Sequence, residues 1–135
     1  MQIKLLLIAL SFVTQIYASE SFILSVPETS VKVTLLSKSP SHYTDGYERG
    51  IVKGDFTKIL REQNVTLLPF VVSNQGSGVF YYIALFKDHK HIRSFFIGDR
   101  VVLVKIQREE DLLKVFYTSR EGKKDYKEFS TLCSM

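Results

Sequence analysis

Tryptophan is absent from this sequence of 135 residues, and the only cysteine is Cys133, close to the end. A single cysteine excludes an internal disulfide, so packing alone has to hold the fold together. Because a free cysteine commonly behaves as a small apolar residue, we interpret Cys133 as part of a last strand. A reactive thiol and an intermolecular bridge are the alternatives.

A clustered basic surface is also missing, although the formal net charge is +4. The densest basic stretch, Arg120 to Lys127, is diluted by Glu121 and Asp125, as is typical of a solvated turn. Nucleic-acid-binding domains usually gather lysine and arginine on one face. We therefore expect no nucleic-acid partner.

No long helical pattern occurs beyond the N-terminus. Residues Met1 to Ala18 contain Lys4, then the apolar run Leu5 to Val13, and end on the small residue Ala18. This order predicts a cleavable secretory signal peptide, and its apolar core is shorter than the roughly 20 residues that span a bilayer. We expect cleavage after Ala18, an exported domain over residues 19–135, and no integral membrane segment in the mature chain.

Residues 19–135 are predicted to form a single β-rich domain. Val31, Val33 and Leu35 alternate with polar neighbours, which is the pattern of a half-buried strand. Turn clusters recur about every 8–12 residues, the spacing that all-β folds show. We predict an all-β antiparallel meander that forms a small sandwich or a barrel.

Four segments carry more specific expectations. Ser37 to Gly46 is rich in Ser, Pro, Asp and Gly and is predicted to be a loop. Phe56 to Glu62 fits either one helical turn or a strand. Pro69 predicts that Val65 to Val72 is an edge strand or a bulged strand. Val79 to Phe86 is apolar on both faces and should be a central strand that is covered on both sides.

Three histidines are candidates for chemistry. His89 and His91 would share one face of a strand, and His42 is the only other histidine. Two ligands do not specify a zinc site, which needs a third and usually a fourth, so we favour an exposed hairpin tip and predict no cofactor. Gly76-Ser77-Gly78 lacks the spacing of a nucleophile elbow or a P-loop. A small hydrolase or metal-dependent enzyme that uses His42, His89 or His91 remains the alternative function.

Three stretches carry a resemblance. They are Asp45-Gly46-Tyr47-Glu48-Arg49-Gly50, then Leu68-Pro69-Phe70-Val71-Val72 leading to Gly76-Ser77-Gly78-Val79-Phe80-Tyr81-Tyr82, and Gly98-Asp99-Arg100-Val101 with Val115-Phe116-Tyr117-Thr118-Ser119-Arg120. In this order they resemble a group of small exported bacterial proteins of unknown function, some of them lipoproteins. The resemblance implies a periplasmic location, with extracellular release as the alternative. The chain departs from the group because no lipoprotein cysteine follows the signal.

We interpret the mature chain as a non-catalytic binding module. Aromatic and hydrogen-bonding side chains, which interfaces favour, gather in two predicted loops, Tyr43 to Arg49 and Asn74 to Gly78. The expected partner is an envelope protein or a glycan, and the oligomeric state is left open. The candidate binding residues are Tyr43, Asp45, Tyr47, Arg49, Asn74 and Arg100.

Overall fold

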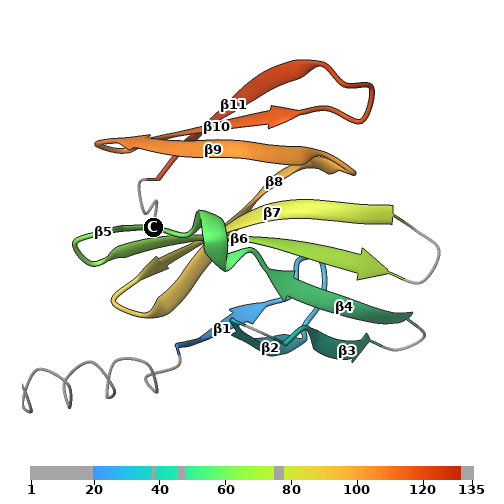
Figure 1. Cartoon of the computed structure of the whole chain (residues 1–135). Helices are drawn as coiled ribbons and strands as arrows, with labels where there is room; N and C mark the ends of the chain where they lie inside the picture. Colours follow the sequence, from blue (N-terminus) through green and yellow to red (C-terminus); the bar gives the residue numbers. More distant parts are fainter. Residues whose placement is uncertain (1–19, 38, 46–47, 75–77, 132–135) are drawn as a thin grey trace, which may run out of the picture.

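The computed structural model describes residues 20–37, 39–45, 48–74 and 78–131 (Figure 1). The predicted signal peptide, Tyr47 and Cys133 lie outside these residues. The first half of the fold consists of β1 (Ser21–Ser25), β2 (Lys32–Leu36), β3 (Ser41–Asp45), β4 (Glu48–Gly54), the 3-10 turn η1 (Phe56–Lys58), β5 (Leu60–Glu62) and β6 (Val65–Asn74). The second half consists of β7 (Gly78–Lys87), β8 (Lys90–Asp99), β9 (Val102–Glu109), β10 (Leu112–Thr118) and β11 (Lys124–Ser130).

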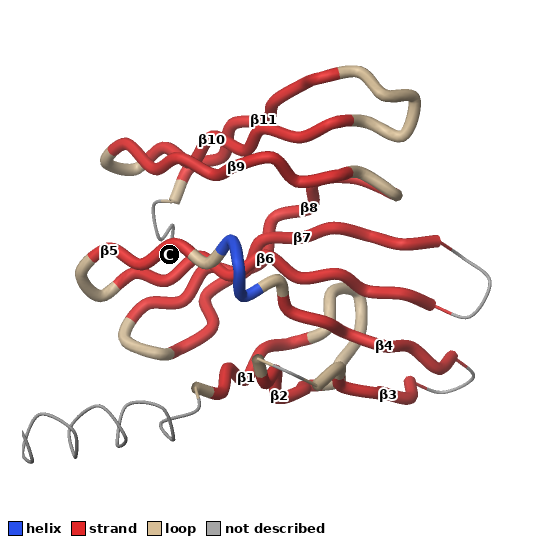
Figure 2. The backbone as a smooth tube through the Cα atoms, viewed as in Figure 1, coloured by secondary structure: helices blue, strands red, loops and turns tan. Residues whose placement is uncertain are grey.

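The described chain is all-β apart from η1 (Figure 2), which confirms the predicted fold class. Every strand pair is antiparallel. The strands form a β1-β2 hairpin, a six-stranded sheet ordered β3-β4-β6-β7-β8 with β5 beside β6, and a sheet ordered β11-β10-β9. Most hydrogen-bonded neighbours are consecutive strands, as in a meander, except that β4 and β5 both pair with β6, and none of these sheets closes into the barrel that was one of the two predicted forms.

The six-stranded sheet lies between two smaller layers. In Figure 1, β9–β11 lie above it and the β1-β2 hairpin lies below it. Two separate apolar clusters fill the two spaces. The lower cluster joins the hairpin to one sheet face, for example through Leu24, Leu35 and Phe70. The upper cluster joins the other face to β9 and β10, for example through Leu85 and Leu113.

Strands β6 and β7 supply side chains to both clusters because successive residues of a strand point to opposite faces. In β6, Leu67 belongs to the upper cluster and Leu68 to the lower one. In β7, Leu85 and Phe86 divide in the same way. The prediction that Val79 to Phe86 is a central strand is confirmed, but coverage on both sides holds only for Ile83 to Phe86, since residues 79–82 are half-buried.

Pro69 does not place β6 at an edge, and that prediction is wrong: β6 pairs with β7 on one side and with β4 and β5 on the other. The reason lies in the gap between β4 and β5. The carbonyl of Pro69 accepts a hydrogen bond from the N–H of Asp55, at 2.7 Å, in that gap. In a strand, the N–H and C=O of one residue point to the same side. The N–H that proline lacks therefore faces η1 and would pair with no strand.

Two further segments differ from the sequence interpretation. Residues 41–45, which we expected in a loop, form β3, the outermost strand of the sheet beside β4. Polar residues suit an edge strand because one of its faces and one of its sides stay solvated. Phe56 to Glu62 combines both alternatives, since η1 comes first and β5 follows.

A β-bulge interrupts the pairing of β7 with β8. Tyr81 is opposite Gly98 and Tyr82 is opposite Phe96, so Ile97 is the extra residue. A bulge bends its strand and redirects neighbouring side chains. Phe96 pairs directly with Tyr82 and shares its face, whereas its neighbours Phe95 and Ile97 point into the upper cluster. No helix within the described ranges is long and apolar enough to cross a membrane.

Candidate binding cleft

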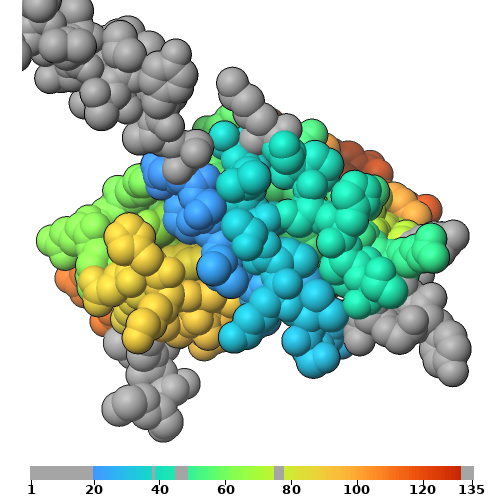
Figure 3. Space-filling view, turned by 90° about the horizontal axis from the view of Figure 1, so that it is seen from below, coloured from blue at the N-terminus to red at the C-terminus, as the bar shows by residue number. Residues whose placement is uncertain are grey.

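The β1-β2 hairpin covers only part of the lower sheet face. Figure 3 views this face and shows β1 and β2, in blue to cyan, lying across its middle. Where the hairpin turns, a cleft of about 350 Å³ opens between the turn and the sheet. We call it the aromatic cleft; its lining residues are Pro27, Glu28, Thr29, Tyr43, Val72, Asn74, Phe80, Tyr82 and Phe96.

Aromatic rings form most of the sheet side of the cleft. Tyr82 and Phe96 lie 5.4 Å apart between ring centroids with an interplanar angle of 57°. Phe80 and Phe96 lie 6.3 Å apart at 51°. Tyr82 is in turn supported by Phe70, whose ring stacks against it at 5.4 Å. Phe96 is 46% exposed although it is a large apolar side chain, so the cleft presents aromatic surface to solvent.

Tyr43 closes one end of the cleft by reaching across a strand. Its partner in β4 is Gly50, whose partner in β6 is Asn74. The Tyr43 ring passes over Gly50 in the space that a side chain would occupy. The Tyr43 hydroxyl then donates a hydrogen bond of 2.6 Å to Oδ1 of Asn74. This arrangement leaves the Asn74 amide nitrogen without a hydrogen bond to any residue in the described part of the chain.

A second hollow of about 590 Å³ lies beside the aromatic cleft and is more open to solvent. Tyr43 and Asn74 line both, so their bridge separates the two. Arg49, His42 and Ile51 also line the second hollow. This hollow has fewer aromatic rings among its lining residues than the cleft.

The electrostatics of the cleft depend on Glu28. Burial raises the pKa of the Tyr82 hydroxyl, and the negative charge of Glu28 raises it further, with a smaller effect from Tyr43. Glu28 and Tyr82 both line the cleft. At neutral pH the Tyr82 hydroxyl is protonated, so it offers a ligand a hydrogen-bond donor and an acceptor.

The predicted binding residues divide into three groups. Tyr43 and Asn74 meet in the cleft, and Arg49 lies beside them in the second hollow. Asp45 ends β3 opposite Glu48, and Tyr47 lies outside the described residues. Arg100 lines neither hollow. The sequence interpretation missed four residues that line the cleft: Glu28, Phe80, Tyr82 and Phe96.

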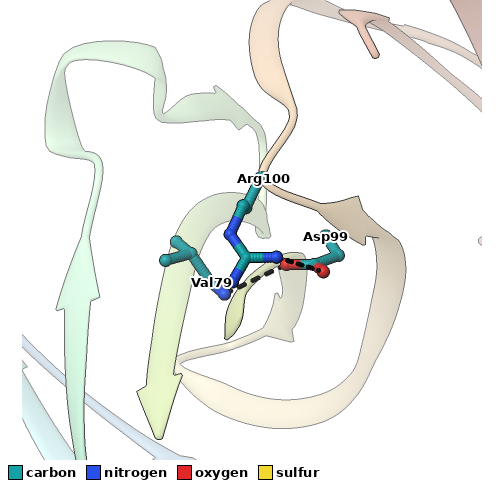
Figure 4. A network of polar contacts seen from close by, with 3 residues as sticks. All are labelled: Val79, Asp99 and Arg100. Atoms are coloured by element: carbon teal, nitrogen blue, oxygen red, sulfur yellow. Dashed lines mark hydrogen bonds and ion pairs between the residues drawn. The ribbon is translucent and has the colours of Figure 1, made fainter. Parts of the chain in front are cut away.

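Arg100 has a structural environment instead, at the corner where β8 leads into β9 (Figure 4). Its Nη1 lies 3.0 Å from Oδ2 of Asp99, and its N–H donates to the carbonyl of Val79 at 2.7 Å. Oδ1 of Asp99 accepts a hydrogen bond from the N–H of Val79 at 3.1 Å. The φ angle of Arg100 is 54°, so these bonds hold a left-handed corner that joins the two sheets.

The three histidines do not converge on one site. His42 lies on β3, whereas His89 and His91 lie at the β7-β8 turn and the start of β8. Both ring nitrogens of His91 are engaged: Nδ1 accepts the N–H of Ser25 at 3.2 Å, and Nε2 lies 2.9 Å from Oγ of Ser94. His91 thus fastens β1 to β8. Burial lowers its pKa, against a smaller opposing effect of a backbone hydrogen bond with Arg93.

Within the described ranges, no three His, Cys, Asp or Glu side chains are grouped so as to hold a metal ion. Comparison with known proteins adds no assignment, because no protein-family model, curated protein or solved structure matches the chain. The resemblance to small exported bacterial proteins accordingly stays a prediction.

Proposed function

We propose that this chain is a non-catalytic binding module that is exported to the bacterial envelope and takes its ligand in the aromatic cleft. The observation that carries the proposal is the gathering of Tyr43, Phe80, Tyr82 and Phe96 around one solvent-open cleft of about 350 Å³. This volume falls within the range of small-molecule sites, which combine apolar walls with a few polar groups.

The polar groups of the cleft favour binding over turnover. Among the described residues that line it, Glu28 is the only carboxylate, and none is a histidine, cysteine or lysine. Nucleophilic and acid–base catalysis need a nucleophile beside a base, or an acid and a base on either side of a reacting bond. A single carboxylate among aromatic rings, an amide and hydroxyls meets neither requirement. The hydrolase alternative gains no support from the separated histidines.

Export is supported by the order of charge, apolar run and small residue in Met1 to Ala18. The motif resemblance supports a bacterial source and the periplasm, with extracellular release as the alternative. The partner would then be an envelope protein or an envelope glycan, one part of which enters the cleft.

A capture experiment tests this function. Immobilised wild type, Phe96→Ala and Tyr126→Ala are each incubated with bacterial envelope extract, and the bound material is compared. Tyr126 is a matched control because it is also a half-exposed aromatic, at 53%, but lies on the outer face of β11. We expect one species to be held by wild type and Tyr126→Ala and lost by Phe96→Ala. Equal retention by all three folded proteins would place the site elsewhere, and retention by none would refute the proposed function.

A further inference from the structure

Glu28 is held at the lip of the cleft by an unusual turn. The N–H of Thr29 donates to the carbonyl of Val26 at 3.1 Å, with Pro27 in the second position. Glu28 occupies the third position with a φ of 64°. These features define a type II turn, whose third position favours glycine or asparagine. A glutamate there is strained, and strained residues concentrate where function requires a particular side chain.

Within the described part of the chain, the Glu28 carboxylate forms no salt bridge, and Glu28 is the only charged residue that lines the cleft. A cation lies near the aromatic rings at Lys127, whose Nζ is 5.5 Å from the centre of Phe96. That ammonium donates to the carbonyl of Ile97 at 2.7 Å and does not line the cleft. The negative charge of Glu28 is therefore left for a ligand.

The aromatic rings of the cleft are inclined to one another and do not form one flat surface. Phe96 is inclined by 57° to Tyr82 and by 51° to Phe80. A flat ligand such as a sugar ring stacks best on one exposed aromatic face, whereas inclined faces surround a rounded group. The faces of aromatic rings carry negative potential and attract cations within about 6 Å, which is how aromatic cages recognise quaternary ammonium groups.

We propose that the aromatic cleft binds an organic ammonium group, with Glu28 supplying the opposite charge and Tyr43, Phe80, Tyr82 and Phe96 supplying the cage. This inference rests on the proposed function, since it names the chemistry of the ligand at the same site. The group is either a quaternary ammonium solute or headgroup, or the amine at the end of a partner's lysine side chain.

The test compares two ligands of the same shape. Choline and 3,3-dimethylbutan-1-ol differ in a single atom, nitrogen for carbon, and hence in charge. The full chain, labelled with ¹⁵N, is titrated with each while the amide resonances of Glu28, Tyr82 and Phe96 are followed. We expect choline to shift these resonances at concentrations roughly tenfold lower than the neutral alcohol. N-acetyl-lysine amide is titrated in parallel to distinguish a lysine side chain from a quaternary ammonium group.

Two variants separate charge from shape. Glu28→Gln should weaken choline binding roughly tenfold and leave the neutral alcohol unaffected. Glu121→Gln, which removes a carboxylate from the exposed turn before β11, should change neither titration. Circular dichroism and urea unfolding show that each variant folds.

The outcomes distinguish this inference from the proposed function. Equal affinity for choline and the alcohol, or no response to either cation at the three amides, overturns the ammonium inference. Binding of a neutral disaccharide at the same amides also overturns it, in favour of a glycan ligand. In each of these cases the envelope capture and its loss in Phe96→Ala still decide whether the cleft is a binding site.

Discussion

Tyr43 and Asn74 meet across an intervening strand, and their hydrogen bond of 2.6 Å is made over the backbone of Gly50. The bond ties the edge strand β3 to β6 and fixes the wall between the two hollows. A neutral hydrogen bond of this kind contributes about 0.5–1.5 kcal/mol. In a double-mutant cycle with Tyr43→Phe and Asn74→Ala, measured by urea unfolding, we expect a coupling energy in that range. A coupling near zero would mean that the two side chains act independently.

Gly50 should tolerate no side chain while Tyr43 is present. A β-carbon at this position would overlap the Tyr43 ring, and Gly50 is itself buried. Overpacking of this kind costs about 1–3 kcal/mol. We expect Gly50→Ala to lower the urea midpoint, and to do so less when it is combined with Tyr43→Ala, which vacates the space. The same loss in both backgrounds would show that the ring is not what excludes a methyl group.

His91 should make stability depend on pH. Burial holds the pKa of its imidazole below the ordinary value of 6.5. Between the folded-state pKa and 6.5, the unfolded chain binds more protons than the folded chain, so acid favours unfolding. The stability that neutral His91 contributes is complete above 6.5 and is lost as the pH falls through the folded-state pKa. Protonation also removes Nδ1 as the acceptor for Ser25.

Urea midpoints measured from about pH 7.5 down to about pH 5 follow this loss. His91→Asn keeps an acceptor near the position of Nδ1 but cannot titrate, so its midpoint should vary less with pH. His89→Gln removes the exposed histidine of the neighbouring turn and serves as the matched control. If the pH dependence disappeared in His89→Gln and persisted in His91→Asn, then His89 and not His91 would be its cause.

The sequence predicted the fold class because alternation and turn spacing are local signals. Val33, Leu35, Val115 and Tyr117 alternate with more exposed neighbours, and all four are buried. The place of Pro69 was not predictable by the same means. The missing N–H costs no strand hydrogen bond because η1 separates β4 from β5 where Pro69 faces them. This separation is a property of how the strands pair and cannot be seen in the sequence of Val65 to Val72 alone.

The site was predicted only in part for a similar reason. Tyr43 and Asn74 stood out because polar and aromatic residues in apparent loops suggest binding. Phe80 and Tyr82 lie in an apolar run that predicts a covered strand, and nothing local shows that the β1-β2 hairpin stops short of them. Phe96 shares their face because it pairs directly with Tyr82, and this register, with its two shifts, is not visible in the local sequence. Glu28 follows Pro27 in a plain turn pattern, and only the fold places that turn over the aromatic rings.

Glu28 should be a position where stability and binding conflict. A left-handed φ costs a non-glycine residue about 1–2 kcal/mol. Substitution by glycine removes this cost, but glycine also raises the conformational entropy of the unfolded chain, which offsets part of the gain. We expect Glu28→Gly to stabilise the fold by about 0.5–1 kcal/mol and to weaken choline binding roughly tenfold. Glu28→Ala should weaken binding to the same extent but gain no stability, because alanine keeps the strain. Destabilisation by glycine would show that the turn depends on contacts of the glutamate side chain.

Lys127 should stabilise the bulge of β8 from the neighbouring layer. Ile97 is the residue that the bulge leaves out of register, and Nζ of Lys127 donates to its carbonyl at 2.7 Å. The same ammonium lies 5.5 Å from the Phe96 ring and 6.0 Å from the Tyr117 ring. A hydrogen bond from a charged group contributes about 1.5–3 kcal/mol, and partial exposure of Lys127 lowers this contribution toward 1 kcal/mol.

We therefore expect Lys127→Met to lose about 1 kcal/mol of unfolding free energy, because methionine keeps the apolar stem and removes the donor. Lys123→Met, in the exposed turn before β11, should stay within about 0.5 kcal/mol of wild type. Among the described strands, β8 pairs with β7 alone, so losing Lys127 would leave its other edge less protected against pairing between molecules. Sedimentation of Lys127→Met should then show association at high concentration, and a monomer as stable as wild type would refute the role of the lysine.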